Sequence, residues 1–177
     1  MKFLVPDDVE LLMKNHKEWI ELFPLAVSVG AGNDRPILVL QDKEKNFSLP
    51  VWLGSLDAAA AMVQASSTSP DSTPHRTTQN ILKAFKSELK FCLFQEIVGH
   101  NQFVDLVLRL GTVVEEYLTV RCRADESMSI CLLSQARFFS PIEIIKKSRD
   151  MESDLKHAPV LNAMSALKEP RTKELLN

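Results

Sequence analysis

Apolar and polar positions alternate early in the chain in the way that half-buried strands require. After Pro24, the segment LAVSVG (25–30) alternates, and PILVL (36–40) is a short apolar run of the kind found in buried strands. The charged stretch QDKEKN (41–46) separates this run from FSLPVWL (47–53), which again has a strand pattern. Two such runs joined by a short polar loop predict a β-hairpin.

Helical spacing replaces this alternation elsewhere in the chain. Asp7 and Glu10 form a capping pair in front of apolar residues on one helical face, among them Trp19, so a first helix is expected over about 7–18. An Ala-rich run and two further apolar stripes continue the helical pattern. The segment Ser-Pro-Ile-Glu (140–143) has the residues typical of a helix start and predicts the last helix. The later helices are expected over 57–65, 79–89 with Ile81, Leu82 and Phe85 inward, 126–135, and from Ser140 onward.

A second run of strands and one loop complete the pattern. KFCLFQEIV (90–98), QFVDLVLRL (102–110) and VEEYLTVRC (114–122) are strand-like, and Gly-containing turns separate them. The segment SSTSPDSTPHRTT (66–78) is rich in Ser, Thr and Pro and is expected to be a surface loop or lid. Three lysines at roughly helical spacing come after this loop: Lys83, Lys86 and Lys90. They form either a basic stripe or the ordinary solvated face of a helix.

Strands therefore occur in two runs with short turns, and helices occur in runs between and after them. That order predicts the α+β class, with mostly antiparallel strands and helices packed against them. The expected organisation is an N-terminal helix over 1–19, one domain over 20–150 and a C-terminal tail over 151–177.

Composition narrows the function classes. The chain has 177 residues, 45% of them hydrophobic, and a formal net charge of −2, which argues against tight nonspecific binding to duplex DNA. Cys92, Cys122 and Cys131 form no CxxC pair, so neither a disulfide framework nor a zinc ribbon is expected. No signal peptide or membrane-spanning segment is expected from the apolar runs, and the expected location is the cytoplasm.

The segment LPVWLGSLDAAAA (49–61) is similar to the signature of the bifunctional nuclease family (DUF151). In that family a strand reading L-P-I-W-I-G precedes a helix that opens on Glu-Ala. The matching residues here are Leu49, Pro50, Trp52, Gly54 and the pair Asp57-Ala58.

Two weaker motifs follow in the family's order. Residues 78–82 stand where the family has T-H-D-L-L, but Gln79 and Asn80 replace the histidine and aspartate. Residues 123–131 resemble R-P-S-D-A-I-A-L-A, with the arginine kept and Glu126 in place of the aspartate. The family's following β segment and helix correspond loosely to Arg137 through Ile145, so the resemblance covers about 20–147.

This resemblance implies an α+β fold, a homodimer or higher homo-oligomer, and a nuclease activity that some members have. Phosphodiester hydrolysis commonly uses Mg²⁺ or Mn²⁺ held by converging carboxylates. Asp57, Asp125 and Glu126 lie at expected helix starts, where backbone amides also favour an anion, and are the candidate metal ligands. Asp57, Glu126 and Arg123 are the candidate catalytic residues on an RNA or DNA substrate. Arg123, Gln79 and Asn80 are the candidates for substrate binding, since a guanidinium pairs well with phosphate.

Each candidate residue also has a structural interpretation. Asp57 and Asp125 are expected equally well as helix caps, and Arg123 with Glu126 as an ion pair. Trp52 is expected in the core, while His75 and His100 are candidates only if their loop and turn are ordered near a site. Neither Gln79 nor Asn80 is an effective general base near neutral pH. Two functions therefore remain open: a metal-dependent nuclease, or a non-catalytic, self-associating regulatory or binding module.

Overall fold

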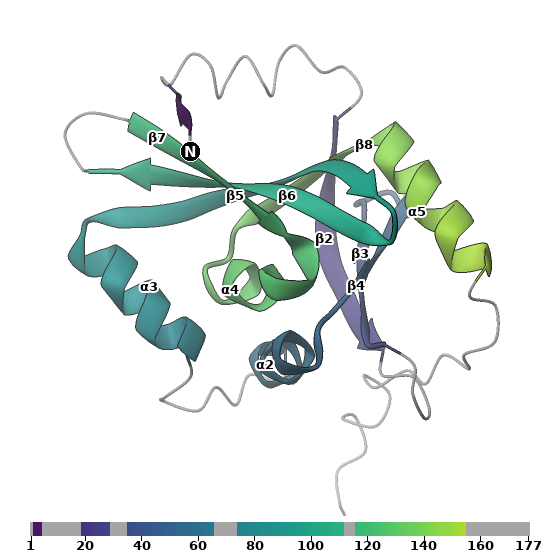
Figure 1. Cartoon of the computed structure of the whole chain (residues 1–177), viewed down its shortest axis with the longest axis horizontal. Helices are drawn as coiled ribbons and strands as arrows, with labels where there is room; N and C mark the ends of the chain where they lie inside the picture. The colour runs from purple at the N-terminus through teal and green to yellow at the C-terminus, as the bar shows by residue number, and fades with distance from the viewer. Residues whose placement is uncertain (1, 5–18, 29–34, 66–73, 112–115, 155–177) are drawn as a thin grey trace, which may run out of the picture.

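The computed structural model describes residues 2–4, 19–28, 35–65, 74–111 and 116–154, and these form one curled mixed sheet with helices packed against it (Figure 1). The strands are β1 (Lys2–Leu4), β2 (Trp19–Ser28), β3 (Ile37–Gln41), β4 (Ser48–Trp52), β5 (Ser87–Val98), β6 (Asn101–Leu110), β7 (Glu116–Arg123) and β8 (Arg137–Pro141). The helices are α2 (Ser55–Ala65), α3 (Pro74–Ala84), the short 3₁₀ helix η1 (Ala124–Glu126), α4 (Met128–Leu133) and α5 (Ile142–Asp154). None of these described helices is long and apolar enough to cross a membrane.

Within the described residues the strand order is β1-β7-β6-β5-β8-β2-β3-β4. Every neighbouring pair is antiparallel except β5 and β8, which run parallel. The expected α+β class, with two runs of mostly antiparallel strands, is confirmed. Strand β8 joins the two runs, because it lies between β5 and β2.

Helices α2, α3 and α4 gather on one side of the sheet, while α5 lies apart from them against β4, β5 and β8 (Figure 1). The short helix α4 contacts both α2 and α3 and is almost entirely buried. Apolar side chains of the inner sheet face and of α4 form the main core, of which Phe94 is the largest fully buried member. Trp52 is buried, as expected.

Two prolines in the first run of strands, Pro24 and Pro50, occupy positions where a missing backbone N–H is tolerated. Pro50 lies in β4, which is one of the two edge strands of the described sheet. Pro24 lies at a β-bulge in β2, after the part of that strand that pairs with β8 and at the start of the part that pairs with β3. Both prolines therefore fit the sheet without breaking a central ladder.

Several boundaries differ from those expected. Trp19 begins β2 and is not part of a helical face, and α3 begins at Pro74, within the segment expected to be a loop, and ends at Ala84. Ile81 and Phe85 were expected to point inward, but both are exposed. The strand β8 was not expected from the apolar pattern, because its last two residues, Ser140 and Pro141, open the Ser-Pro-Ile-Glu helix start. The family resemblance did imply a β segment between Arg137 and Ile145. The boundaries proposed near 19 and 150 fall at the start of β2 and inside α5, while the helix expected over 7–18 and the tail beyond 154 lie outside the described residues.

Candidate functional site

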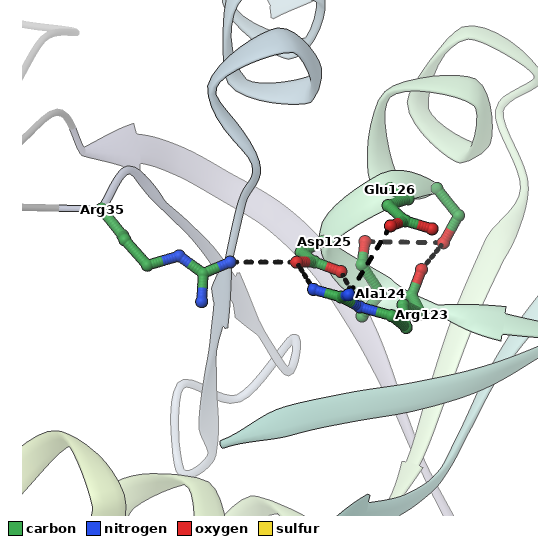
Figure 2. Close-up of polar contacts among 6 residues, drawn as sticks. Arg35, Arg123, Ala124, Asp125 and Glu126 are labelled. Atoms are coloured by element: carbon green, nitrogen blue, oxygen red, sulfur yellow. Dashed lines mark hydrogen bonds and ion pairs between the residues drawn. The ribbon is translucent and has the colours of Figure 1, made fainter.

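Four of the predicted site residues fall into two separate groups: Asp57 in one, and Arg123, Asp125 and Glu126 in the other. We call Asp57, His75 and Ser129 the α4 cluster, because they meet at the N-terminus of that helix. We call Arg35, Arg123, Asp125 and Glu126 the arginine cluster, which lies at η1 (Figure 2). Two larger hollows, of about 340 and 260 Å³, flank Phe23 and Pro24 and are lined by none of the predicted site residues.

Asp57 caps α4 from a neighbouring helix. Its side chain lies in the first turn of α2, is only 5% exposed, and accepts the backbone N–H of Ser129 at 3.1 Å from Oδ2. The Ser129 hydroxyl also donates to Oδ1 of Asp57. The residue in front of α4, Ser127, makes no side-chain cap of its own. Asp57 therefore supplies the acceptor that the first turn of a helix otherwise lacks.

His75 extends this interaction into a chain of hydrogen bonds. Its Nε2 atom lies 2.7 Å from Ser129 Oγ and 3.7 Å from Asp57 Oδ1. Because the Ser129 hydroxyl donates its hydrogen to Asp57, its oxygen can accept a hydrogen bond from the Nε2–H of His75. The imidazole, the hydroxyl and the carboxylate are thus linked in that order, with Ser129 fully buried between the other two.

Burial raises the pKa of Asp57 above its usual range. Hydrogen bonds from Ser129 and the nearby His75 oppose the effect of desolvation without cancelling it. A buried carboxylate of this kind holds a proton more readily than an exposed one. Its oxygens are already occupied by donors from α4, so this arrangement stabilises the helix packing.

Gln79 holds the other end of α4. Its Nε2 atom donates to the carbonyl oxygen of Leu133 at 3.2 Å, which satisfies an acceptor in the last turn of that helix. Gln79 lies one turn after His75 on α3, so both side chains face α4. Asn80, the next residue, is exposed. The structure therefore separates two of the three predicted substrate-binding residues, because Gln79 contacts α4 while Asn80 is exposed.

Replacing Gln79 with alanine is expected to lower the free energy of unfolding by about 1 kcal/mol, since one partly buried hydrogen bond is lost and the Leu133 carbonyl is left without that donor. Urea denaturation followed by circular dichroism measures the change. The neighbouring exposed substitution Asn80→Ala is the control, with an expected change within about 0.5 kcal/mol. Equal effects of the two substitutions would contradict the capping role of Gln79.

The arginine cluster is built around the Asp125 carboxylate. Arg123 donates Nε to Oδ1 at 2.9 Å and an η nitrogen to Oδ2 at 2.5 Å, while Arg35 donates to Oδ2 at 3.0 Å. Figure 2 shows the two guanidinium groups meeting at this one carboxylate. Asp125 has a side chain only 12% exposed, whereas those of Arg35 and Arg123 are 47% and 41% exposed. The hydrogen bonds to Asp125 raise the pKa of Arg123 further above its ordinary value.

Backbone contacts bring these residues together from distant parts of the chain. The Leu53 N–H donates to the Pro36 carbonyl at 2.8 Å, which extends the β3–β4 pairing to Pro36, the residue after Arg35. The next amide, of Gly54, donates to the Asp125 carbonyl at 3.0 Å. A Cβ atom on Gly54 would lie 3.2 Å from that carbonyl oxygen, so glycine permits the close approach of η1.

The predicted metal ligands do not converge. Asp57 belongs to the α4 cluster, and Asp125 is engaged by two arginines. Glu126 is 66% exposed, and the ion pair it makes is a long one of 3.8 Å with Arg123. Within the described ranges, no three His, Cys, Asp or Glu side chains lie together in a group that could hold a metal ion. Asp57, Asp125 and Glu126 therefore do not fit a shared Mg²⁺ or Mn²⁺ site.

Two members of these clusters, Arg35 and Ser129, were not considered as site residues from the sequence, and His75 was a candidate only on condition that its loop is ordered near a site. His75 lies four residues before Gln79, and this helical spacing could have placed both on one face of a helix that starts earlier. Arg35 directly precedes a strand whose hairpin partner ends at Trp52, so hairpin pairing could have placed it beside the LPVWLG segment. Ser129 carries no signal of its own in the sequence.

Comparison of the sequence with known proteins gives no family assignment. No protein-family model matches the chain, and no curated protein matches it.

Proposed function

We propose that the protein is a non-catalytic, self-associating binding module with a fold of the bifunctional nuclease type, acting in the cytoplasm. The observation that carries the proposal is the use of Asp57 as a buried cap of α4. A metal-dependent nuclease of the expected kind would need this carboxylate at a shared cation site with Glu126. The carboxylate instead accepts two donors from Ser129, and Glu126 points to solvent beside Arg123.

Large apolar side chains on the outer surface support the self-association. Leu56 on α2 is 90% exposed, and Phe85, directly after α3, is 75% exposed. Met62 and Ile81 on the same two helices are also exposed. Exposed apolar side chains that gather into a contiguous patch mark protein–protein interfaces. A second copy of the chain is the occupant that the resemblance to the bifunctional nuclease family favours.

A metal-dependent nuclease acting on RNA or DNA is the second candidate function. It is supported by the exposed guanidinium groups of Arg35 and Arg123, which have donors left for a phosphate, and by the exposed Glu126 nearby. In that function Mg²⁺ or Mn²⁺ would be held by Glu126 together with the nucleic acid phosphates, since the other predicted ligands are engaged.

Cleavage of labelled single-stranded RNA and DNA by the purified protein distinguishes the two candidates. With Mg²⁺ or Mn²⁺ present, we expect no cleavage above that seen with a chelator. Glu126→Gln tests the exposed carboxylate, and Glu143→Gln, at an exposed position in the first turn of α5, is the matched control. Cleavage that the chelator and Glu126→Gln abolish, but Glu143→Gln retains, would replace the binding module with the nuclease.

Self-association gives a further expected result. Light scattering of the purified protein should give at least twice the chain mass of 19.9 kDa, and Leu56→Asp should reduce it to that of one chain. The reason is that a charge buried in an apolar interface is strongly unfavourable. Val98→Asp, at an exposed apolar position in β5, is the control and should leave the mass unchanged. A wild-type protein with the mass of one chain at every concentration would refute self-association.

A further inference from the structure

Helix α3 is held to the rest of the fold by few interactions. It contacts α4 and β5, and none of its described side chains, from His75 to Ala84, is buried. Leu82 packs against the main core, while His75 and Gln79 form hydrogen bonds with α4. Segments with few buried apolar contacts have a low local stability. A single further interaction can therefore decide whether such a helix is docked or released.

One of these contacts closes over a buried ionisable group. The Nε2 atom of His75 lies 2.7 Å from the Ser129 hydroxyl and 3.7 Å from the Asp57 carboxylate, which is only 5% exposed. Release of α3 would take the imidazole away from this carboxylate and give water access to it. The docking of α3 and the charge of Asp57 are therefore coupled at the α4 cluster.

The net charge of the α4 cluster depends on a single proton. When His75 or Asp57 holds one proton, the charges sum to zero, either as two neutral groups or as an imidazolium beside a carboxylate. Without that proton, an ionised Asp57 leaves one negative charge beneath α3. A buried charge without a partner is unfavourable, whereas an exposed carboxylate is well hydrated. Two ionisable groups this close titrate as a pair, so the proton belongs to the cluster as a whole.

The other charged groups around the cluster are engaged or distant. On α3, Arg76 follows His75 and has an interaction of its own, and Lys83 lies in the last turn. The ionisable group of α4 is Cys131, which is fully buried. Charged groups on the neighbouring elements are paired: Glu88 with Lys90 and Glu96 with Arg121 on β5, Glu21 of β2 with Arg137, and Asp125 and Glu126 of η1 with Arg123. His75 is therefore the group that balances the charge of Asp57.

We propose that the one proton held by the α4 cluster keeps α3 docked, and that loss of this proton as the pH rises releases α3. The docked form binds the proton more tightly than the released form, so docking is complete at acidic pH and is lost as the pH rises. Burial acts in this direction, because it raises the pKa of Asp57 in the docked form above 3.8. Imidazole groups change their charge between about pH 5 and pH 8, which sets the range to compare.

The release of α3 has a consequence for contacts between copies of the chain. Ile81 on α3 is 52% exposed, and Phe85, directly after the helix, is 75% exposed. Both belong to the apolar side chains that support self-association, so association should be weaker at pH 8 than at pH 5. This consequence rests on the proposed function, whereas the docking of α3 does not.

Hydrogen exchange of the full chain, followed by nuclear magnetic resonance at pH 5 and pH 8, tests the inference. After correction for the intrinsic effect of pH on exchange, the α3 amides should be about tenfold better protected at pH 5, which corresponds to a coupling of about one pKa unit. The amides of α5, which lies apart from the cluster, are the internal reference and should change little. Equal losses of protection in α3 and α5 would show a general destabilisation and overturn the proposal.

Two matched variants assign the effect to the cluster. Asp57→Asn keeps an oxygen for the Ser129 N–H but cannot ionise, so its α3 protection should be the same at both pH values. Asp105→Asn is the control, because Asp105 is another partly buried carboxylate whose pKa burial raises, but it lies on β6. This control should keep the wild-type difference.

His75→Gln retains a donor for the Ser129 hydroxyl and removes the basic group, so it should reduce the difference between the two pH values. A wild-type protein without the difference, or an Asp57→Asn variant that keeps it, overturns the proposal. Exchange is measured at low protein concentration and reports on single chains. Its outcome is therefore independent of the cleavage and mass measurements that test the proposed function.

Discussion

Replacing Asp57 with alanine should lower the free energy of unfolding by about 2–3 kcal/mol. The substitution removes the cap of α4 and leaves two donors of Ser129, the backbone N–H and the hydroxyl, without their acceptor in a fully buried position. It also detaches α2 from the helix that it contacts most. Urea denaturation at pH 7, followed by circular dichroism, measures the loss.

Asp57→Asn is the informative comparison for this site. The asparagine keeps an oxygen for the Ser129 N–H and removes the cost of burying a charge, so the loss should be smaller, about 1 kcal/mol or less. If the alanine variant were as stable as the wild type, Asp57 would be free for another role and the case for the non-catalytic module would weaken.

The wild type and the Asp57→Asn variant should also differ in how their free energy of unfolding depends on pH. Burial raises the folded-state pKa of Asp57 above its ordinary value of 3.8, so the folded protein binds this proton more tightly than the unfolded chain does. The wild type therefore gains stability as the pH falls through the raised pKa, has the full gain below 3.8, and loses it as the pH rises. The asparagine variant lacks this contribution. The stability of the wild type relative to Asp57→Asn should thus decrease from acidic to neutral pH, and an unchanged difference would contradict the burial effect.

Replacing Phe94 with alanine should cost about 3–5 kcal/mol, the largest loss expected for a single substitution in this chain. Phe94 lies in β5, is 1% exposed, and is the largest fully buried side chain of the described residues. Its removal leaves a cavity in the strand that pairs with both β6 and β8. Urea denaturation gives the change in the free energy of unfolding, and the slope with denaturant shows whether unfolding stays cooperative.

Phe85→Ala is the control with the same chemical change. Phe85 is 75% exposed, so its ring makes few buried contacts that the substitution could remove. The expected change in the free energy of unfolding is therefore within about 0.5 kcal/mol. Both variants should be measured at the same low protein concentration, because self-association would stabilise the folded chain. A small effect at Phe94, or a large one at Phe85, would place the core elsewhere.

The fold class could be predicted from the sequence because the strands carry a local pattern. The runs around 36–40, 47–53 and 90–98 have the apolar content and turn residues that strands show wherever they pack. The five residues of β8 have no such local mark, since their place between β2 and β5 depends on partners far away in the chain. The start of α3 at Pro74 was missed because Ser, Thr and Pro are typical of loops, although proline also fits the first turn of a helix.

The site was less predictable for a related reason. Acidic residues at helix starts were expected either as caps or as ligands, and only the three-dimensional partner decides between these roles. For Asp57 the partner is Ser129, 72 positions later in the chain, and for Asp125 it includes Arg35, 90 positions earlier. Burial of Trp52 was expected, but nothing in the sequence indicates that its indole nitrogen would lack an acceptor among the described residues.

The central place of β8 also has a consequence for protein synthesis. Until Arg137–Pro141 has left the ribosome, the strands made earlier can form only two separate sheets, one from β2, β3 and β4 and one centred on β5 and β6. The facing edges at β2 and β5 then stay open, and open strand edges readily pair with other chains. A nascent chain that stalls before residue 137 should therefore be a preferred substrate for chaperones, while completion of β8 closes both edges at once.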